Sequence, residues 1–160
     1  MAHGFLSNWQ VNGTAYLQSG VAYTVVNATS RTNTGNGAGT LNGGDRPIVN
    51  GDPNLSSSER TVQRWFDTSV FSPAPQFSAG NIGLDLMHGP SQRRLDFSLF
   101  KDLTLGTTQK LQLRMEVYNI TNTPSFWLPD FNFGSPGFGS ISSTGNSIPR
   151  QMQFGLKYLF

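Results

Sequence analysis

The segment 150–160 alternates between apolar and polar side chains. Apolar residues occupy the even positions from 152 to 160, and most of the odd positions are polar. A period of two is typical of a β-strand with one apolar and one polar face. In a transmembrane β-barrel, lipid-facing and lumen-facing residues alternate in this way, and aromatic residues mark the membrane interface. A last strand docked onto a soluble β-sandwich is the alternative interpretation of this segment.

The same alternation recurs in three earlier segments, 9–19, 94–101 and 110–119. It is clearest in 110–119, where aliphatic residues and methionine alternate with polar residues and a tyrosine. No segment shows the period of 3.6 residues that a helix requires. We therefore expect an all-β fold, an antiparallel meander of about four amphipathic strands that forms a segment of a transmembrane β-barrel.

Two long segments, 27–92 and 120–148, are rich in Gly, Asn, Ser, Thr and Pro, which favours loops. Only 103–109 separates the second expected strand from the third. Long loops therefore lie at one end of the strands and a short turn at the other, as in outer-membrane barrels, whose long loops are external. Ten residues at ~3.3 Å each, tilted ~45°, cover roughly the 25 Å apolar band of such a barrel.

Composition narrows the class of protein. The chain has 160 residues, of which 36% are hydrophobic, 12% are charged and 18 are glycine, an unusual balance for a soluble α or α/β domain. A net charge of +2 with scattered basic residues does not favour nucleic acid as a partner. The absence of cysteine excludes disulfides and thiolate metal sites. No apolar run approaches the ~20 residues of a spanning helix.

The expected strands are too few to close a barrel by themselves. The smallest membrane barrels have about eight strands, and an open edge in lipid leaves backbone groups unpaired. The first residues show no basic segment followed by an apolar run, so we expect no signal peptide there. Both observations indicate that the chain is part of a longer protein.

Each face of the expected strands carries a set of candidate site residues. On the polar face we expect an ion-pair ladder directed at the barrel lumen, formed by Asp96, Arg114, Glu116 and Lys157. On the other face we expect lipid contacts from Leu95, Phe97, Leu99, Leu111, Leu113, Met115, Val117, Met152 and Leu156.

Residues for catalysis or metal binding are sparse. The two histidines, His3 and His88, lie far apart in the sequence, so we expect no metal site and no cofactor. No Ser/His/Asp triad or acid pair has a supporting context, so we expect no enzyme. Four aspartates are expected to be solvated turn residues rather than calcium ligands, because no Asp-x-Asp-x-Asp spacing occurs: Asp45, Asp52, Asp67 and Asp85.

Seven short blocks carry a resemblance to a known family. In chain order they are QSGVAYTV (18–25), RPIVNGDPNL (46–55), RWFDTSVF (64–71), GNIG (80–83), LDFSLFK (95–101), EVYNITNTPSF (116–126) and PRQMQFGLKYLF (149–160). In order and spacing, they resemble the C-terminal end of TonB-dependent outer-membrane transporters. The similarity is greatest to the Oar-like branch, which carries a carboxypeptidase-regulatory-like N-terminal domain.

The resemblance implies a barrel of about 22 strands in the bacterial outer membrane, of which this chain would supply the last four. Such transporters import scarce nutrients, using energy passed from the inner membrane. The implied partners are outer-membrane lipid, the rest of the barrel with its plug domain, and the barrel-assembly machinery. That machinery would recognise the terminal strand through Phe154, Tyr158 and Phe160. The plug, the TonB-contacting box and the signal peptide of the full family pattern are missing from this sequence.

Two other functions stay open from sequence alone. A secreted β-rich adhesin or fibre module would also suit loops rich in glycine, asparagine and serine. A carbohydrate-binding β-sandwich would use Trp65 and Trp127 to stack on sugar rings. Both alternatives predict a water-soluble protein.

Overall fold

The structure is a computed structural model that describes residues 6–33, 44–145 and 147–160. The chain divides into two compact units. We call the first the strand unit (Met1–Gln18, Gln92–Pro124 and Asn146–Phe160) and the second the loop unit (Ser19–Ser91 and Ser125–Gly145). The loop unit contains a 3₁₀ turn, η1 (Thr68–Val70). In the described part of the chain, no helix is long and apolar enough to cross a membrane.

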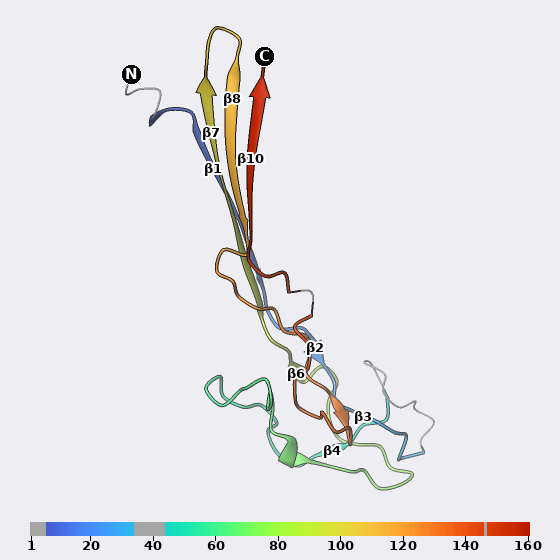
Figure 1. Cartoon of the computed structure of the whole chain (residues 1–160). Coiled ribbons are helices and arrows are strands. Elements are labelled where there is room, and N and C mark those ends of the chain that lie inside the picture. Colours follow the sequence, from blue (N-terminus) through green and yellow to red (C-terminus); the bar gives the residue numbers. More distant parts are fainter. Residues whose placement is uncertain (1–5, 34–43, 146) are drawn as a thin grey trace. The chain divides into compact units, whose positions relative to one another are not determined.

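The strand unit is one antiparallel sheet of four strands in the order β1-β7-β8-β10 (Figure 1). Their bounds are β1 Trp9–Gln18, β7 Gln92–Thr104, β8 Lys110–Tyr118 and β10 Gln151–Leu159. The expected all-β antiparallel fold is confirmed, and the strands coincide closely with the expected 9–19, 94–101, 110–119 and 150–160. β7 is longer than expected at both ends, because β1 pairs with it as far as Gln92 and the alternation continues past Lys101.

The turn between β7 and β8 lies at the same end of the sheet as the C-terminus (Figure 1). It spans only 105–109, and the Leu105 amide donates to the Gln109 carbonyl across it at 3.0 Å. At the opposite end β8 ends at Tyr118, and the next residue, Asn119, adopts a left-handed conformation with φ 50°. Asparagine tolerates this conformation better than most residues. The chain leaves the sheet here.

The Asn119 side chain holds together the connection that follows β8. Its amide nitrogen donates to the carbonyls of Thr123 and Ile148, at 3.1 and 2.9 Å, and its side-chain oxygen accepts from the Thr123 amide. The side chain is buried, so these bonds satisfy groups that would otherwise be costly to desolvate. A single asparagine thus ties the start of the connection between β8 and β10 to its end.

The loop unit has a hydrophobic core of its own. Six buried side chains form it: Tyr23, Val25, Phe66, Phe71, Ile82 and Met87. Phe66 and Phe71 also pack edge-to-face against Phe138, with ring centroids 5.2 and 5.4 Å apart, a preferred aromatic geometry. The two long connections of the chain therefore fold together into one packed unit.

Short strand pairs support this core. β3 (Val26–Asn27) pairs in parallel with β9 (Asn132–Phe133), which joins the first long connection to the second. Two antiparallel pairs complete the unit, β2 (Ala22–Tyr23) with β6 (Met87–His88) and β4 (Ile48–Val49) with β5 (Phe71–Ser72). The expected loops 27–92 and 120–148 thus contain short strands and a core. Residues 34–43 of the first loop lie outside the described part of the chain.

Asp45 corrects one expectation, because it is 2% exposed and is not a solvated turn residue. Its carboxylate accepts from the Arg31 amide at 2.6 Å and from the Thr32 amide and hydroxyl at 2.9 and 2.6 Å. Burial opposes ionisation, but these hydrogen bonds outweigh it and hold the pKa of Asp45 below its ordinary value. The buried Asp45 carboxylate therefore stabilises the backbone at 31–32 through these hydrogen bonds.

Candidate functional site

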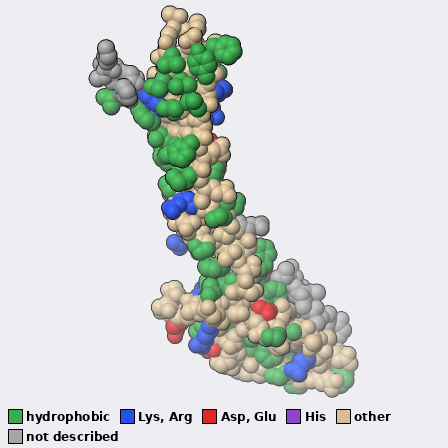
Figure 2. Space-filling view, viewed as in Figure 1, with side chains coloured by type: hydrophobic (Ala, Val, Ile, Leu, Met, Phe, Trp, Pro, Cys, Tyr) green, Lys and Arg blue, Asp and Glu red, His purple; other side chains and the backbone are tan. Residues whose placement is uncertain are grey.

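The strand sheet has one apolar face. Neighbouring strands pair in a register that keeps apolar residues together: Val11 with Leu99, Leu99 with Met115, and Met115 with Phe154. Hydrophobic side chains gather on the visible surface of these strands in Figure 2. Many of them are exposed, Phe154 by 73%, which is far from the burial expected of a core residue. An exposed apolar face of this extent marks a surface that water does not normally cover.

All nine side chains expected to contact lipid lie on this apolar face. The register of the sheet keeps them on that side: eight of them pair along β7, β8 and β10, and Leu95 pairs with Ala15 of β1. Val117, between Phe97 and Met152 on the flanking strands, is the member of this set that is buried. The sequence therefore placed this set correctly on one face, and contact of that face with lipid stays a prediction.

The apolar face is hollowed near its middle. A groove of about 470 Å³ crosses the sheet, and its apolar lining comes from all four strands: Trp9, Leu99, Leu113, Met115, Phe154 and Leu156.

Lys101 is a charged residue on this face that the expected set did not include. It lies opposite Trp9 on β1 and Leu113 on β8, and it is 4% exposed. Its ammonium group lies 5.2 Å from the Trp9 ring centroid, a cation–π contact, and donates to the Ser7 carbonyl oxygen. The alternation along β7 could have predicted this position, because Lys101 follows Leu95, Phe97 and Leu99 at intervals of two residues.

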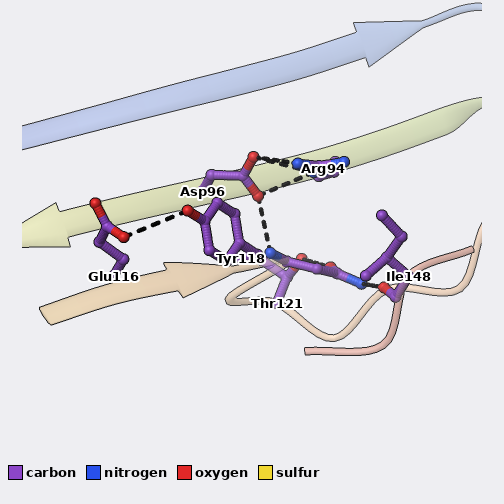
Figure 3. Close-up of polar contacts among 7 residues, drawn as sticks. Arg94, Asp96, Glu116, Tyr118, Thr121 and Ile148 are labelled. Atoms are coloured by element: carbon purple, nitrogen blue, oxygen red, sulfur yellow. Dashed lines mark hydrogen bonds and ion pairs between the residues drawn. The ribbon is translucent and has the colours of Figure 1, made fainter. Parts of the chain in front are cut away.

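The opposite face carries a polar network centred on Asp96 (Figure 3). Its carboxylate accepts from the Arg94 guanidinium at 2.7 to 3.0 Å and from the backbone amide of Asn119 at 2.8 Å. On the same face the Tyr118 hydroxyl donates to Glu116 at 3.4 Å. The bond from the Asn119 amide to Asp96 links β7 to the end of β8. Hydrogen bonds to an ionised carboxylate are stronger than those between neutral groups.

The expected ladder residues Asp96, Arg114, Glu116 and Lys157 share this polar face, but the expected ion pairs between strands do not form among the described residues. The ion pair on this face joins Arg94 to Asp96 within β7. The register explains the difference, because Arg114 lies opposite Phe100 and Gly155, Glu116 opposite Ser98 and Gln153, and Lys157 opposite Gln112. No two of the four residues are direct cross-strand neighbours.

Arg114 takes other partners instead. Its guanidinium donates to the Gln112 side-chain oxygen at 2.6 Å and lies 5.1 Å from the Phe100 ring centroid. Gln112 in turn donates to Asp102 at 2.8 Å. Hydrogen bonds rather than cross-strand ion pairs therefore connect these side chains of the polar face. That this face points into a barrel lumen stays a prediction.

The three residues expected to form the barrel-assembly signal lie on the apolar side of β10 or just past its end. Phe154 faces Met115 of β8 and Tyr158 faces Leu111. The rings of Tyr158 and Phe160 stack with centroids 6.1 Å apart. Their arrangement agrees with an amphipathic strand that carries aromatic residues at one end, and recognition by assembly machinery stays a prediction.

The sheet has two free edges within the part of the chain that the structure describes. β1 and β10 are the edge strands, and neither pairs with a further described strand on its outer side. Edge strands with unpaired backbone groups readily accept another strand. In lipid such an edge costs several kcal/mol per unpaired group. An exposed apolar face together with two open edges is what a section of a barrel wall presents when its neighbouring strands are absent.

Comparison with known proteins agrees with this geometry. A family model described as an outer membrane beta barrel domain matches residues 1–153, which include β1, β7, β8 and the start of β10. No curated protein and no solved structure matches the chain. The matched family places the chain in the outer membrane. An antiparallel sheet with one apolar face is the wall architecture of such barrels. The chain belongs to the outer membrane beta barrel domain family.

Proposed function

We propose that this chain supplies four consecutive wall strands of a TonB-dependent outer-membrane transporter that imports a scarce nutrient. The support for this finer assignment is the series of seven sequence blocks, whose order resembles the C-terminal end of such transporters. Membership of the outer membrane barrel family is consistent with it. The branch that the blocks resemble most is the Oar-like one.

The geometry that best supports the proposal is an exposed apolar face on a sheet that also has two open edges. Neighbours in the sheet follow chain order, β1-β7-β8-β10, as in an up-and-down barrel. Four strands cannot enclose a lumen, so the proposal places the remaining strands beyond β1 and β10. Strand addition at these edges would satisfy the backbone groups that lipid cannot.

The packed loop unit also suits a transporter. Long external loops of a barrel contact the arriving ligand, and they do so best when their shape is fixed by packing. In this chain the core around Phe66 and Ile82 fixes both long connections together. We propose that this unit forms part of the external mouth of the barrel.

The proposed partners follow from this role. They are outer-membrane lipid on the apolar face, a plug domain against the polar face, and the barrel-assembly machinery at β10. We propose no catalytic activity for this chain, since transport of this kind changes the position of the ligand and not its covalent structure.

Uptake by cells tests the proposal. Cells that lack the gene of the parent barrel are compared with complemented cells for uptake of labelled ferric chelates, cobalamin, oligosaccharides and peptides. We expect one class to be lost without the gene, and lost equally when the inner-membrane energy source is collapsed. Unchanged uptake of all four classes, with the barrel abundant in the complemented cells, would contradict a transporter. Uptake that survives loss of the energy source would indicate a passive pore.

A further inference from the structure

Arg93 is a second cation on the otherwise apolar face. It lies opposite Leu17 on β1, and the next residue of β7 on the same face is Leu95. Leu17, Arg93 and Leu95 are all exposed. Among residues 6–33, 44–145 and 147–160, the guanidinium group of Arg93 forms no hydrogen bond, ion pair or cation–π contact. Its charge is therefore available to a partner outside the chain.

Lys101, the other cation of this face, is held differently. Its ammonium group already contacts the Trp9 ring and the Ser7 carbonyl oxygen, and it is almost completely buried. Arg93 precedes and Lys101 follows the same apolar stretch of β7, whose residues on this face are Leu95, Phe97 and Leu99. Only Arg93 presents its charge at the surface.

Arg93 lies near one border of the apolar band. Leu99, which shares a row of the sheet with Met115 and Phe154, is six positions from Arg93 along β7, or about 20 Å at ~3.3 Å per residue. With a strand tilt of ~40° this distance places Arg93 about 15 Å from the level of Phe154, whereas half of an apolar band roughly 25 Å tall is about 12 Å. The long arginine side chain reaches further outward and can bring its guanidinium to the level of the lipid headgroups.

The chemistry around Arg93 favours an anion. The carboxylates of the four strands, Asp96, Asp102 and Glu116, all lie on the opposite face, so none competes for Arg93 there. A guanidinium left in hydrocarbon is costly, whereas the oxygens of a phosphate match its planar donors in a bidentate manner. We propose that Arg93 binds a phosphate group of lipid A, the anionic lipid of the outer leaflet. The choice of leaflet rests on the outward orientation of the loop unit in the proposed transporter.

Native mass spectrometry of the full-length parent barrel in non-ionic detergent tests this inference. Lipid A is added as the probe, phosphatidylglycerol as the anionic lipid of the inner leaflet, and phosphatidylethanolamine as the zwitterionic control. The variants are Arg93→Gln, Arg93→Lys and the matched control Arg94→Gln. Arg94 is adjacent but lies on the polar face, paired with Asp96. Heat-modifiable migration first establishes that each variant is folded.

We expect Arg93→Gln to lower the fraction of barrel that carries lipid A by at least three-fold, with Arg93→Lys intermediate and Arg94→Gln unchanged. Unchanged binding in Arg93→Gln would overturn the inference. An equal loss in Arg94→Gln would also overturn it, because the two residues lie on opposite faces. A loss confined to phosphatidylglycerol would overturn the assignment to lipid A. The readout does not involve uptake, so a failed transporter proposal would leave this result interpretable.

Discussion

Replacement of Phe154 by lysine tests which face of the sheet meets lipid. Phe154 lies in the middle of β10, opposite Met115, and is 73% exposed. Only about a quarter of its surface is therefore buried against protein. Since complete burial of a phenylalanine contributes roughly 1.5–3 kcal/mol, the packing lost in the Phe154→Lys variant is below about 1 kcal/mol. A large destabilisation would have to come from the surroundings of the protein.

In a barrel wall those surroundings are hydrocarbon. A lysine on the lipid face near the bilayer midplane costs about 2–4 kcal/mol, so we expect Phe154→Lys to destabilise the assembled barrel by that amount. In a water-soluble protein an exposed substitution of this kind would stay within about 0.5 kcal/mol. The two environments therefore predict clearly different results for the same variant.

Gln153→Lys is the matched control, because Gln153 is the preceding residue on the opposite face. It lies opposite Glu116, and a lysine there gains an oppositely charged cross-strand neighbour. We expect its effect to be within about 0.5 kcal/mol. The assay is equilibrium urea unfolding of the full-length parent barrel in phosphatidylcholine vesicles, followed by tryptophan fluorescence. Equal destabilisation by the two variants, or a greater cost at Gln153, would refute the assignment of the apolar face to lipid.

Three further predictions concern the loop unit. Asp45→Asn should destabilise it by about 1–3 kcal/mol, measured by protease resistance, because buried donors lose a charged acceptor. Since folding lowers the pKa of Asp45, its stabilising contribution is complete above the ordinary value of ~3.9 and is lost as the pH falls through the folded value. The acid transition in near-UV circular dichroism should therefore weaken in that variant. Ile82→Ala should cost about 2–5 kcal/mol, and an effect below 1 kcal/mol would contradict a packed core. Gly139→Ala should cost more than Gly134→Ala in thermal unfolding. Both glycines have positive φ, but only at Gly139 would the new methyl group lie 2.5 Å from Thr68.

The four long strands could be predicted from sequence because apolar and polar residues alternate along a strand whose two faces meet different surroundings. Gly106 suggested a longer turn between β7 and β8 than the structure has. β7 instead continues to Thr104, where Asp102 and Leu103 keep the alternation and pair with Gln112 and Leu111. Strand ends were less predictable than strand centres, because pairing with a neighbour decides where a strand stops.

Which segments of the loop unit contact one another was beyond prediction from local pattern. Its parallel pair joins Val26 to Asn132, and its core joins Tyr23 to Phe66 and Phe131 through ring contacts. Such contacts depend on segments more than 40 residues apart in the sequence, and the intervening residues carry little periodicity. Glycine and proline content correctly indicated irregular backbone, but composition does not reveal which irregular segments pack together.

The polar face shows what alternation leaves undetermined. Shared face membership of Asp96 and Arg114 followed from the period of two, but an ion pair also requires matching register. Register depends on the turn between the strands, and here it places Arg114 opposite Phe100. Asp96 therefore takes Arg94 of its own strand as its partner, together with the backbone amide of Asn119.

The two units of this chain follow opposite rules for apolar residues. In the loop unit the large apolar side chains Phe66 and Ile82 are buried, as in any protein that folds in water. In the strand unit Phe154 and Leu156 are exposed although their strand is regular and paired. Hydrophobic burial cannot stabilise a side chain that touches neither protein nor lipid. The exposed face therefore suits the outer membrane, whereas the loop unit buries its large apolar side chains as proteins do in water.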